Sequence, residues 1–121
     1  MGLIDTRPET EPTMAEQTPP APIAAMIEAT NAADSAAFVA AFTDDAYVRD
    51  GSREFTGHNG VADWDRTDNI GVGMQFEVLS TEPAGDDAYV VTIRATSRRF
   101  NGTGPMRVTL RDGLISRLEI G

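Results

Sequence analysis

The sequence contains no cysteine and no lysine, and its single histidine is His58. The absence of cysteine excludes disulfide bonds, thiolate zinc sites, iron–sulfur clusters and cysteine nucleophiles. One histidine cannot build a multi-histidine metal site within one chain. No run of 18 apolar residues occurs, so the sequence predicts no helix that crosses a membrane. We therefore expect neither a metal site nor an organic cofactor.

Basic charge is also scarce, because 19 acidic residues face 10 basic ones and the formal net charge is −9. A nucleic-acid-binding protein needs a basic face to neutralise phosphates, so this balance argues against a nucleic-acid partner. All the basic residues are arginines, which a GC-rich coding bias explains most simply. An arginine that points into a cavity would instead indicate ligand binding, because the planar guanidinium group recognises carboxylates and phosphates.

Residues 1–22 differ in composition from the rest of the chain. They hold five of the seven prolines and show neither a helical nor a strand period. We expect a disordered or extended N-terminal tail over residues 1–22, followed by one small domain over residues 23–121. The tail lacks the basic start and apolar stretch of a secretory signal, so a cytoplasmic location is the default expectation.

The segment after the tail predicts two short helices. Ile23, Met26 and Ile27 recur at the spacing of one helical face. Either Asp34 or Ser35 is suited to cap the second helix, because short polar side chains accept hydrogen bonds from the first turn. The chain therefore begins its domain with an α-α pair.

The remaining sequence alternates between strands and one further helix. Thr56 and Gly57 introduce a third helix that runs to about Asp68, with Val61 and Trp64 facing inward. Alternating apolar residues predict two strands before this helix and four after it. One of these is a long strand over residues 88–100, which a loop at 101–104 follows. The order α-α-β-β-α-β-β-β-β predicts an α+β fold with a mostly antiparallel sheet.

The central segment resembles the SnoaL-like branch of the nuclear transport factor 2-like superfamily. The residues that carry the resemblance are, in order, Phe38, Phe42, Asp44, Asp45, Asp50, Phe55, Gly57, Val61 and Trp64. It extends over roughly residues 22–121. The resemblance implies a cone-shaped curved sheet wrapped around the N-terminal helices, with a pocket between them, and a homodimer formed through the outer sheet face. The superfold hosts enzymes, binding proteins and subunit-contact domains, so it does not define an activity.

Asp50 is the first candidate catalytic residue. It shares a strand face with Val48, a residue expected to point inward, so its carboxylate should reach the pocket. A resemblance to ketosteroid isomerase implies the role of general base for Asp50, and apolar surroundings would favour its neutral form. The alternative is that Asp50 only caps the turn at Gly51 and Ser52.

The sequence differs from related enzymes in three respects, and each difference argues against a particular reaction. Met26 stands where the isomerase has its tyrosine, and no acid lies between Arg99 and Leu110 to complete the oxyanion site. Steroid isomerisation is therefore not expected. A resemblance to limonene-type epoxide hydrolases is weakened because Thr96 stands where an aspartate would help.

His58 and Arg94 are further candidates. His58 begins the third helix and has a suitable intrinsic basicity for proton transfer near neutral pH, although a histidine at a helix start more often lies at the solvated surface. Arg94 would bind a ligand carboxylate or pair with Asp50 if its strand face is concave. On the opposite face it would lie at the dimer contact or in solvent.

Two functions remain open at this point. The first is a domain that binds a small, largely apolar molecule in its pocket, for which we expect the lining residues Met26, Phe38, Phe42, Trp64 and Arg94. The second is a cofactor-free enzyme of the cyclase or isomerase type, with Asp50 or His58 carrying protons. The sequence does not decide between binding and catalysis.

Overall fold

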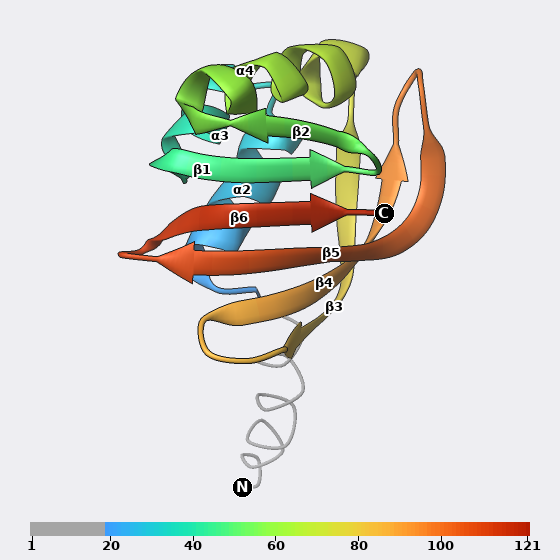
Figure 1. Cartoon of the computed structure of the whole chain (residues 1–121). Helices are drawn as coiled ribbons and strands as arrows, with labels where there is room; N and C mark the ends of the chain where they lie inside the picture. Colours follow the sequence, from blue (N-terminus) through green and yellow to red (C-terminus); the bar gives the residue numbers. More distant parts are fainter. Residues whose placement is uncertain (1–18) are drawn as a thin grey trace, which may run out of the picture.

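The computed structural model describes residues 19–121, and the expected tail falls largely outside this part of the chain, so the division at residue 22 stays a prediction. The elements are helices α2 (Ala21–Asn31), α3 (Ser35–Ala40) and α4 (Gly57–Asp68), a short 3-10 helix η1 (Ile70–Val72), and strands β1 (Phe42–Asp50), β2 (Arg53–Thr56), β3 (Gln75–Pro83), β4 (Ala88–Thr96), β5 (Asn101–Arg111) and β6 (Leu114–Ile120) (Figure 1). This order confirms the predicted α+β class. Within residues 19–121, no helix is long and apolar enough to span a membrane.

All six strands form one sheet in the order β2-β1-β6-β5-β4-β3. Neighbouring strands are antiparallel except for β1 and β6, which run parallel. After the β1–β2 hairpin the chain passes through α4 to the far edge and returns strand by strand until β6 lies against β1. Strand β5 bends strongly along its length, so the sheet curves and presents a concave face (Figure 1).

The helices cover this concave face. In Figure 1, α2 lies behind the sheet and α4 runs along the edge formed by β1 and β2. The largest fully buried apolar side chains come from all three helices and from four strands: Ile23, Met26, Phe38, Phe42, Val48, Val61, Val91, Met106, Val108, Ile115 and Leu118. Each such side chain contributes roughly 1.5–3 kcal/mol of hydrophobic stabilisation when fully buried.

The local sequence signals explain most element boundaries. The Asp34 carboxylate accepts a hydrogen bond from the Ala37 amide at 3.1 Å, which is the expected cap of α3. Leu79 interrupts the alternation in β3, and the pairing of β3 with β4 shifts register there. Leu79 therefore marks a bulge in this edge strand.

The β4–β5 hairpin differs from the prediction. Strand β4 ends at Thr96 instead of continuing to residue 100, and residues 101–104 belong to β5 instead of a loop. Two hydrogen bonds of the Ser97 hydroxyl, from the Phe100 amide at 2.8 Å and to the Phe100 carbonyl at 2.9 Å, close the tight turn. The glycines at 102 and 104 suggested a loop, but strand pairing with β4 overrides this local preference.

Candidate functional site

A cavity of about 520 Å³ opens at one end of the concave face, within the range typical of small-molecule sites. Its apolar lining consists of Trp64, Met74, Phe76, Ile93, Ala95, Phe100, Pro105, Met106 and Ile120. Four charged residues also line it: Asp50, Arg53, Asp68 and Arg99. The cavity is thus mostly apolar, with the charged groups as its polar anchors.

Two glycines of β5 line this space, and one of them helps to open it. Gly104 pairs with Ile93, and Gly102 pairs with Ala95, so both glycines face the same side as these lining residues. A Cβ atom added at Gly104 would meet no atom within 4 Å. Glycine inside a strand often marks the close approach of a ligand or another backbone. Here the missing side chain at Gly104 leaves room in the cavity.

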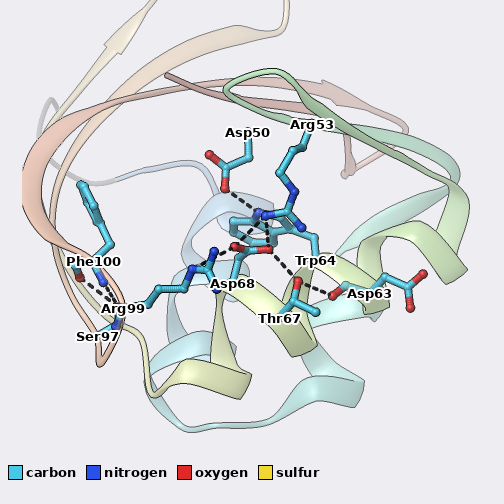
Figure 2. Close-up of polar contacts among 9 residues, drawn as sticks. All are labelled: Asp50, Arg53, Asp63, Trp64, Thr67, Asp68, Ser97, Arg99 and Phe100. Atoms are coloured by element: carbon cyan, nitrogen blue, oxygen red, sulfur yellow. Dashed lines mark hydrogen bonds and ion pairs between the residues drawn. The ribbon is translucent and has the colours of Figure 1, made fainter.

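Asp50 lies in the cavity wall because β1 alternates. Val48 is fully buried, and the same face of the strand carries Asp50 to the cavity. The Trp64 indole N–H donates a hydrogen bond to Asp50 Oδ2 at 3.0 Å (Figure 2). No residue in 19–121 donates a hydrogen bond to the other oxygen, Oδ1. The carboxylate is therefore held by one oxygen and has the other available to a ligand.

The alternative role of Asp50 was to cap the turn at Gly51 and Ser52. Within residues 19–121, no hydrogen bond joins the Asp50 carboxylate to this turn. The Gly51 amide of the turn donates to the Ile120 carbonyl at 2.8 Å and not to the Asp50 side chain. The left-handed φ of Gly51, +64°, shows why glycine suits this turn. The turn therefore closes without using the Asp50 carboxylate.

Asp68 forms a second polar group at the cavity, together with Arg53 and Arg99 (Figure 2). Arg53 Nη1 lies 2.9 Å from each oxygen of the Asp68 carboxylate, and the Thr67 hydroxyl donates to Oδ2 at 2.6 Å. Arg99 Nε lies 3.8 Å from Oδ1. Burial of Asp68 acts to raise its pKa, but the hydrogen bonds from Thr67 and Arg53 and the charges of both arginines outweigh it, so the pKa is lowered.

The sequence analysis did not predict the cluster of Asp68, Arg53 and Arg99. The sequence positions of Arg53 and Asp68 nevertheless indicate that both lie near Asp50 and Trp64. Asp50 and Arg53 pair directly across the β1–β2 hairpin, so a two-residue turn would have placed them on one face. Asp68 follows Trp64 by four residues, which puts both side chains on the same side of α4. The sequence position of Arg99 gave no such indication, because Arg99 lies in the β4–β5 turn, which was expected to be part of a strand.

Three of the residues expected to line the pocket lie beneath it. Met26, Phe38 and Phe42 are almost completely buried and do not border the cavity. The Phe38 ring stacks on Trp64 with centroids 5.9 Å apart, and Phe42 lies 5.1 Å from Phe38. Trp64 therefore separates these phenylalanines from the cavity, which they support from below.

His58 and Arg94 also lie away from the cavity lining. His58 Nε2 donates to the Phe42 carbonyl at 2.9 Å, and it lies 3.7 Å from the Asp44 carboxylate. Arg94 is exposed and forms an ion pair with Glu77 of β3. Because its neighbours Ile93 and Ala95 line the cavity, Arg94 points to the outer face of the sheet.

A curved sheet that encloses a cavity with covering helices is the architecture of nuclear transport factor 2-like proteins. The chain belongs to the SnoaL-like domain family, whose model matches residues 23–118. The comparison with curated proteins finds no match.

Several solved structures share the fold. A proposed polyketide cyclase from Sinorhizobium meliloti is 24% identical, with a TM-score of 0.77 over 85% of this chain and 95% of that chain. An epoxide hydrolase/cyclase-like enzyme of pyran ring formation in the polyether salinomycin is 19% identical, with a TM-score of 0.72 over 81% and 84%. A computationally designed 17-OHP binder is 17% identical, with a TM-score of 0.71 over 81% and 87%. At these identities the likeness shows the fold alone.

Proposed function

We propose that this SnoaL-like domain binds a small, largely apolar molecule in the cavity. The observation that carries the proposal is the combination of a cavity of about 520 Å³, a mostly apolar lining and one carboxylate oxygen of Asp50 that has no protein donor within residues 19–121. The apolar body of the ligand fills the space between Met106 and Phe76. A hydroxyl or N–H group of the ligand donates to Asp50 Oδ1, which gives orientation as well as affinity. The computationally designed 17-OHP binder, which has a similar fold, supports this use of the cavity.

The available oxygen of Asp50 also favours a second candidate, a cofactor-free enzyme of the cyclase or isomerase type. Trp64 holds Oδ2, so Oδ1 is positioned to accept a proton from an acidic C–H or O–H of a bound substrate and to return it elsewhere. His58 does not reach the cavity, and this candidate therefore assigns proton transfer to Asp50 alone. The proposed polyketide cyclase and the epoxide hydrolase/cyclase-like enzyme, which have similar folds, support this reaction class.

Steroid isomerisation is not proposed. Met26, which stands in place of the isomerase tyrosine, is buried in the core and contributes no hydrogen-bond donor to the cavity. Without a neutral oxyanion donor pair, an enolate formed by Asp50 would lack that enzyme's main stabilisation.

Binding is tested by blocking the cavity. Native mass spectrometry of the purified chain looks for a ligand carried through purification, and a thermal-shift screen with polycyclic ketones looks for stabilisation. Gly104→Leu places a large side chain in open cavity space, whereas the control Thr96→Leu changes the outer face of β4. We expect ligand signals in the wild type and in Thr96→Leu but not in Gly104→Leu. Signals that persist in Gly104→Leu would contradict binding in this cavity.

Catalysis is tested with Asp50→Asn, which keeps the shape of the side chain but removes its basicity. If a substrate is found, we expect turnover to fall by roughly 10²- to 10⁴-fold, a larger factor than the loss of binding that follows when the ligand no longer donates to a carboxylate oxygen. Equal turnover in the wild type and in Asp50→Asn would refute proton transfer by Asp50.

The same proposal includes a homodimer through the outer sheet face. The outer face carries Arg94 beside Glu77 and Arg117 beside Glu119, so a two-fold axis can bring each arginine of one copy to a glutamate of the other. Light scattering at tens of micromolar is the test, and a monomer would contradict the dimer. A cytoplasmic location stays a prediction for cell fractionation to examine.

A further inference from the structure

Arg53 and Arg99, the two arginines at the cavity, differ in how closely they contact the Asp68 carboxylate. Arg53 contacts both oxygens of Asp68 at 2.9 Å, and its guanidinium lies 5.0 Å from the centre of the Phe55 ring. Arg99 reaches Asp68 only through Nε at 3.8 Å, which is beyond hydrogen-bond distance. Within residues 19–121, the guanidinium of Arg99 makes no hydrogen bond. The terminal nitrogens of Arg99 are therefore cationic donors at this cavity that no described residue occupies.

An uncovered aromatic ring follows Arg99 directly. Phe100 has 58% of its surface exposed, and it is the one large hydrophobic residue in the described part of the chain that is so exposed. It also lines the cavity, and its ring packs so closely on Gly102 that a Cβ there would approach it to 2.9 Å. An exposed apolar ring at a cavity mouth is a site that a ligand would cover.

The turn that carries both residues is fixed in place. The Arg98 guanidinium donates to the Gly71 carbonyl at 2.8 Å, and the Arg98 amide donates to the Val72 carbonyl at 2.9 Å. The Phe100 amide is held by the Ser97 hydroxyl. Because these bonds anchor the turn to η1, little further ordering is needed when Arg99 and Phe100 meet a ligand.

We propose that the ligand carries a carboxylate at one end of its apolar body, and that Arg99 binds this carboxylate at the cavity mouth while Phe100 covers the adjoining apolar surface. The inference rests on the proposed binding function and specifies its ligand class. A planar monoanion fits the guanidinium fork in a bidentate manner. A dianion fits less well, because the carboxylates of Asp50 and Asp68 border the same cavity and would repel the second charge.

Matched acids and amides test the proposal with the full chain. Isothermal titration calorimetry compares 2-naphthoate, 9-anthroate and pyrene-1-carboxylate with the corresponding carboxamides, which have the same apolar body without the charge. For the body that fits best, we expect the acid to bind about tenfold more tightly than the amide, since one charge-assisted contact at a partly exposed site is the difference. Sodium chloride should reduce this preference, because Arg99 is accessible to solvent.

Variants distinguish carboxylate binding by Arg99 from a general effect of the charge of the protein. In Arg99→Gln the acid should lose its advantage while amide binding stays within about twofold, and Arg99→Lys should retain part of the preference. Arg94→Gln on the outer face is the control and should change neither ligand. Equal binding of acid and amide, or a preference that survives in Arg99→Gln, would overturn the proposal and leave the binding function intact. If none of the six compounds binds, the proposed function fails and this inference fails with it.

Discussion

The ion pair between Asp68 and Arg53 gives the sharpest prediction about stability. Asp68→Asn keeps the size of the side chain but removes the charge that Arg53 and Thr67 contact at 2.9 and 2.6 Å. The Asp68 side chain is only 9% exposed, whereas that of Arg53 is 46% exposed and regains water when its partner is lost. Removing one partner of a fully buried pair costs about 3–5 kcal/mol, and an exposed pair contributes about 0–1 kcal/mol.

An intermediate loss of about 2 kcal/mol is therefore expected for Asp68→Asn at pH 7. For a domain of this size, that loss corresponds to a decrease of roughly 8–16 °C in melting temperature. Asp63→Asn is the matched control on the same helix, because Asp63 pairs with Arg66 at 3.2 Å but both side chains are more than half exposed. We expect a loss below about 0.5 kcal/mol for this control.

The pH dependence of the loss provides a second readout. The pKa of Asp68 is lowered in the folded protein, mainly because the contacts of Thr67, Arg53 and Arg99 outweigh burial. The unfolded chain then binds more protons in the window between the lowered pKa and the ordinary value of about 3.9, so stability falls on acidification. The stabilisation by Asp68 is complete above that value and is lost as the pH falls through the lowered pKa.

Urea denaturation followed by circular dichroism at pH 7 and across the acid range measures both effects. We expect the difference between the wild type and Asp68→Asn to shrink below about pH 4. The reasoning would be refuted if Asp68→Asn lost no more stability than Asp63→Asn at pH 7, or if its loss were the same throughout the acid range.

Three further outcomes are expected from the same structure. Trp64→Phe should cost about 1–2 kcal/mol by circular dichroism, and most of this loss should disappear in an Asp50→Ala background, because the indole bonds to that carboxylate. Gly71→Ala should destabilise the domain by about 3 kcal/mol or more, since its Cβ would lie 1.6 Å from a carbonyl oxygen of α4, whereas Gly104→Ala should be tolerated. Equal melting temperatures of the two variants would contradict this prediction. A chain that begins at Thr18 should melt with the full chain, and a drop of several degrees would show that the preceding residues pack.

The parts of the fold that depend on local pattern were predictable. Alternation in β1 correctly brought Asp50 to the side of Val48, and the apolar face of α4 placed Trp64 inward. These two residues are neighbours because β1 and α4 are joined by a short hairpin, so their contact needs little long-range information. The same short connection would have revealed Arg53.

The position of the cavity was not predictable in this way. It depends on how far β5 pairs with β4, and the segment that holds Gly102 and the space-making Gly104 looked like a loop in the sequence. Curvature of the whole sheet then decides that Phe38 lies below Trp64 and that Met26 is buried away from the cavity lining. Such curvature arises from contacts between distant strands, which no local periodicity encodes.

Trp64 is the single tryptophan of the chain, and it lies in the cavity wall with its indole bonded to a carboxylate. Its ultraviolet emission therefore comes from one place, the surface that a bound molecule would touch. A ligand that displaces the indole from the Asp50 carboxylate should change the emission, and one that absorbs in the near ultraviolet should quench it by energy transfer. The protein can thus be titrated without a dye or label, and a stopped-flow fluorimeter would follow the entry and departure of a ligand in real time.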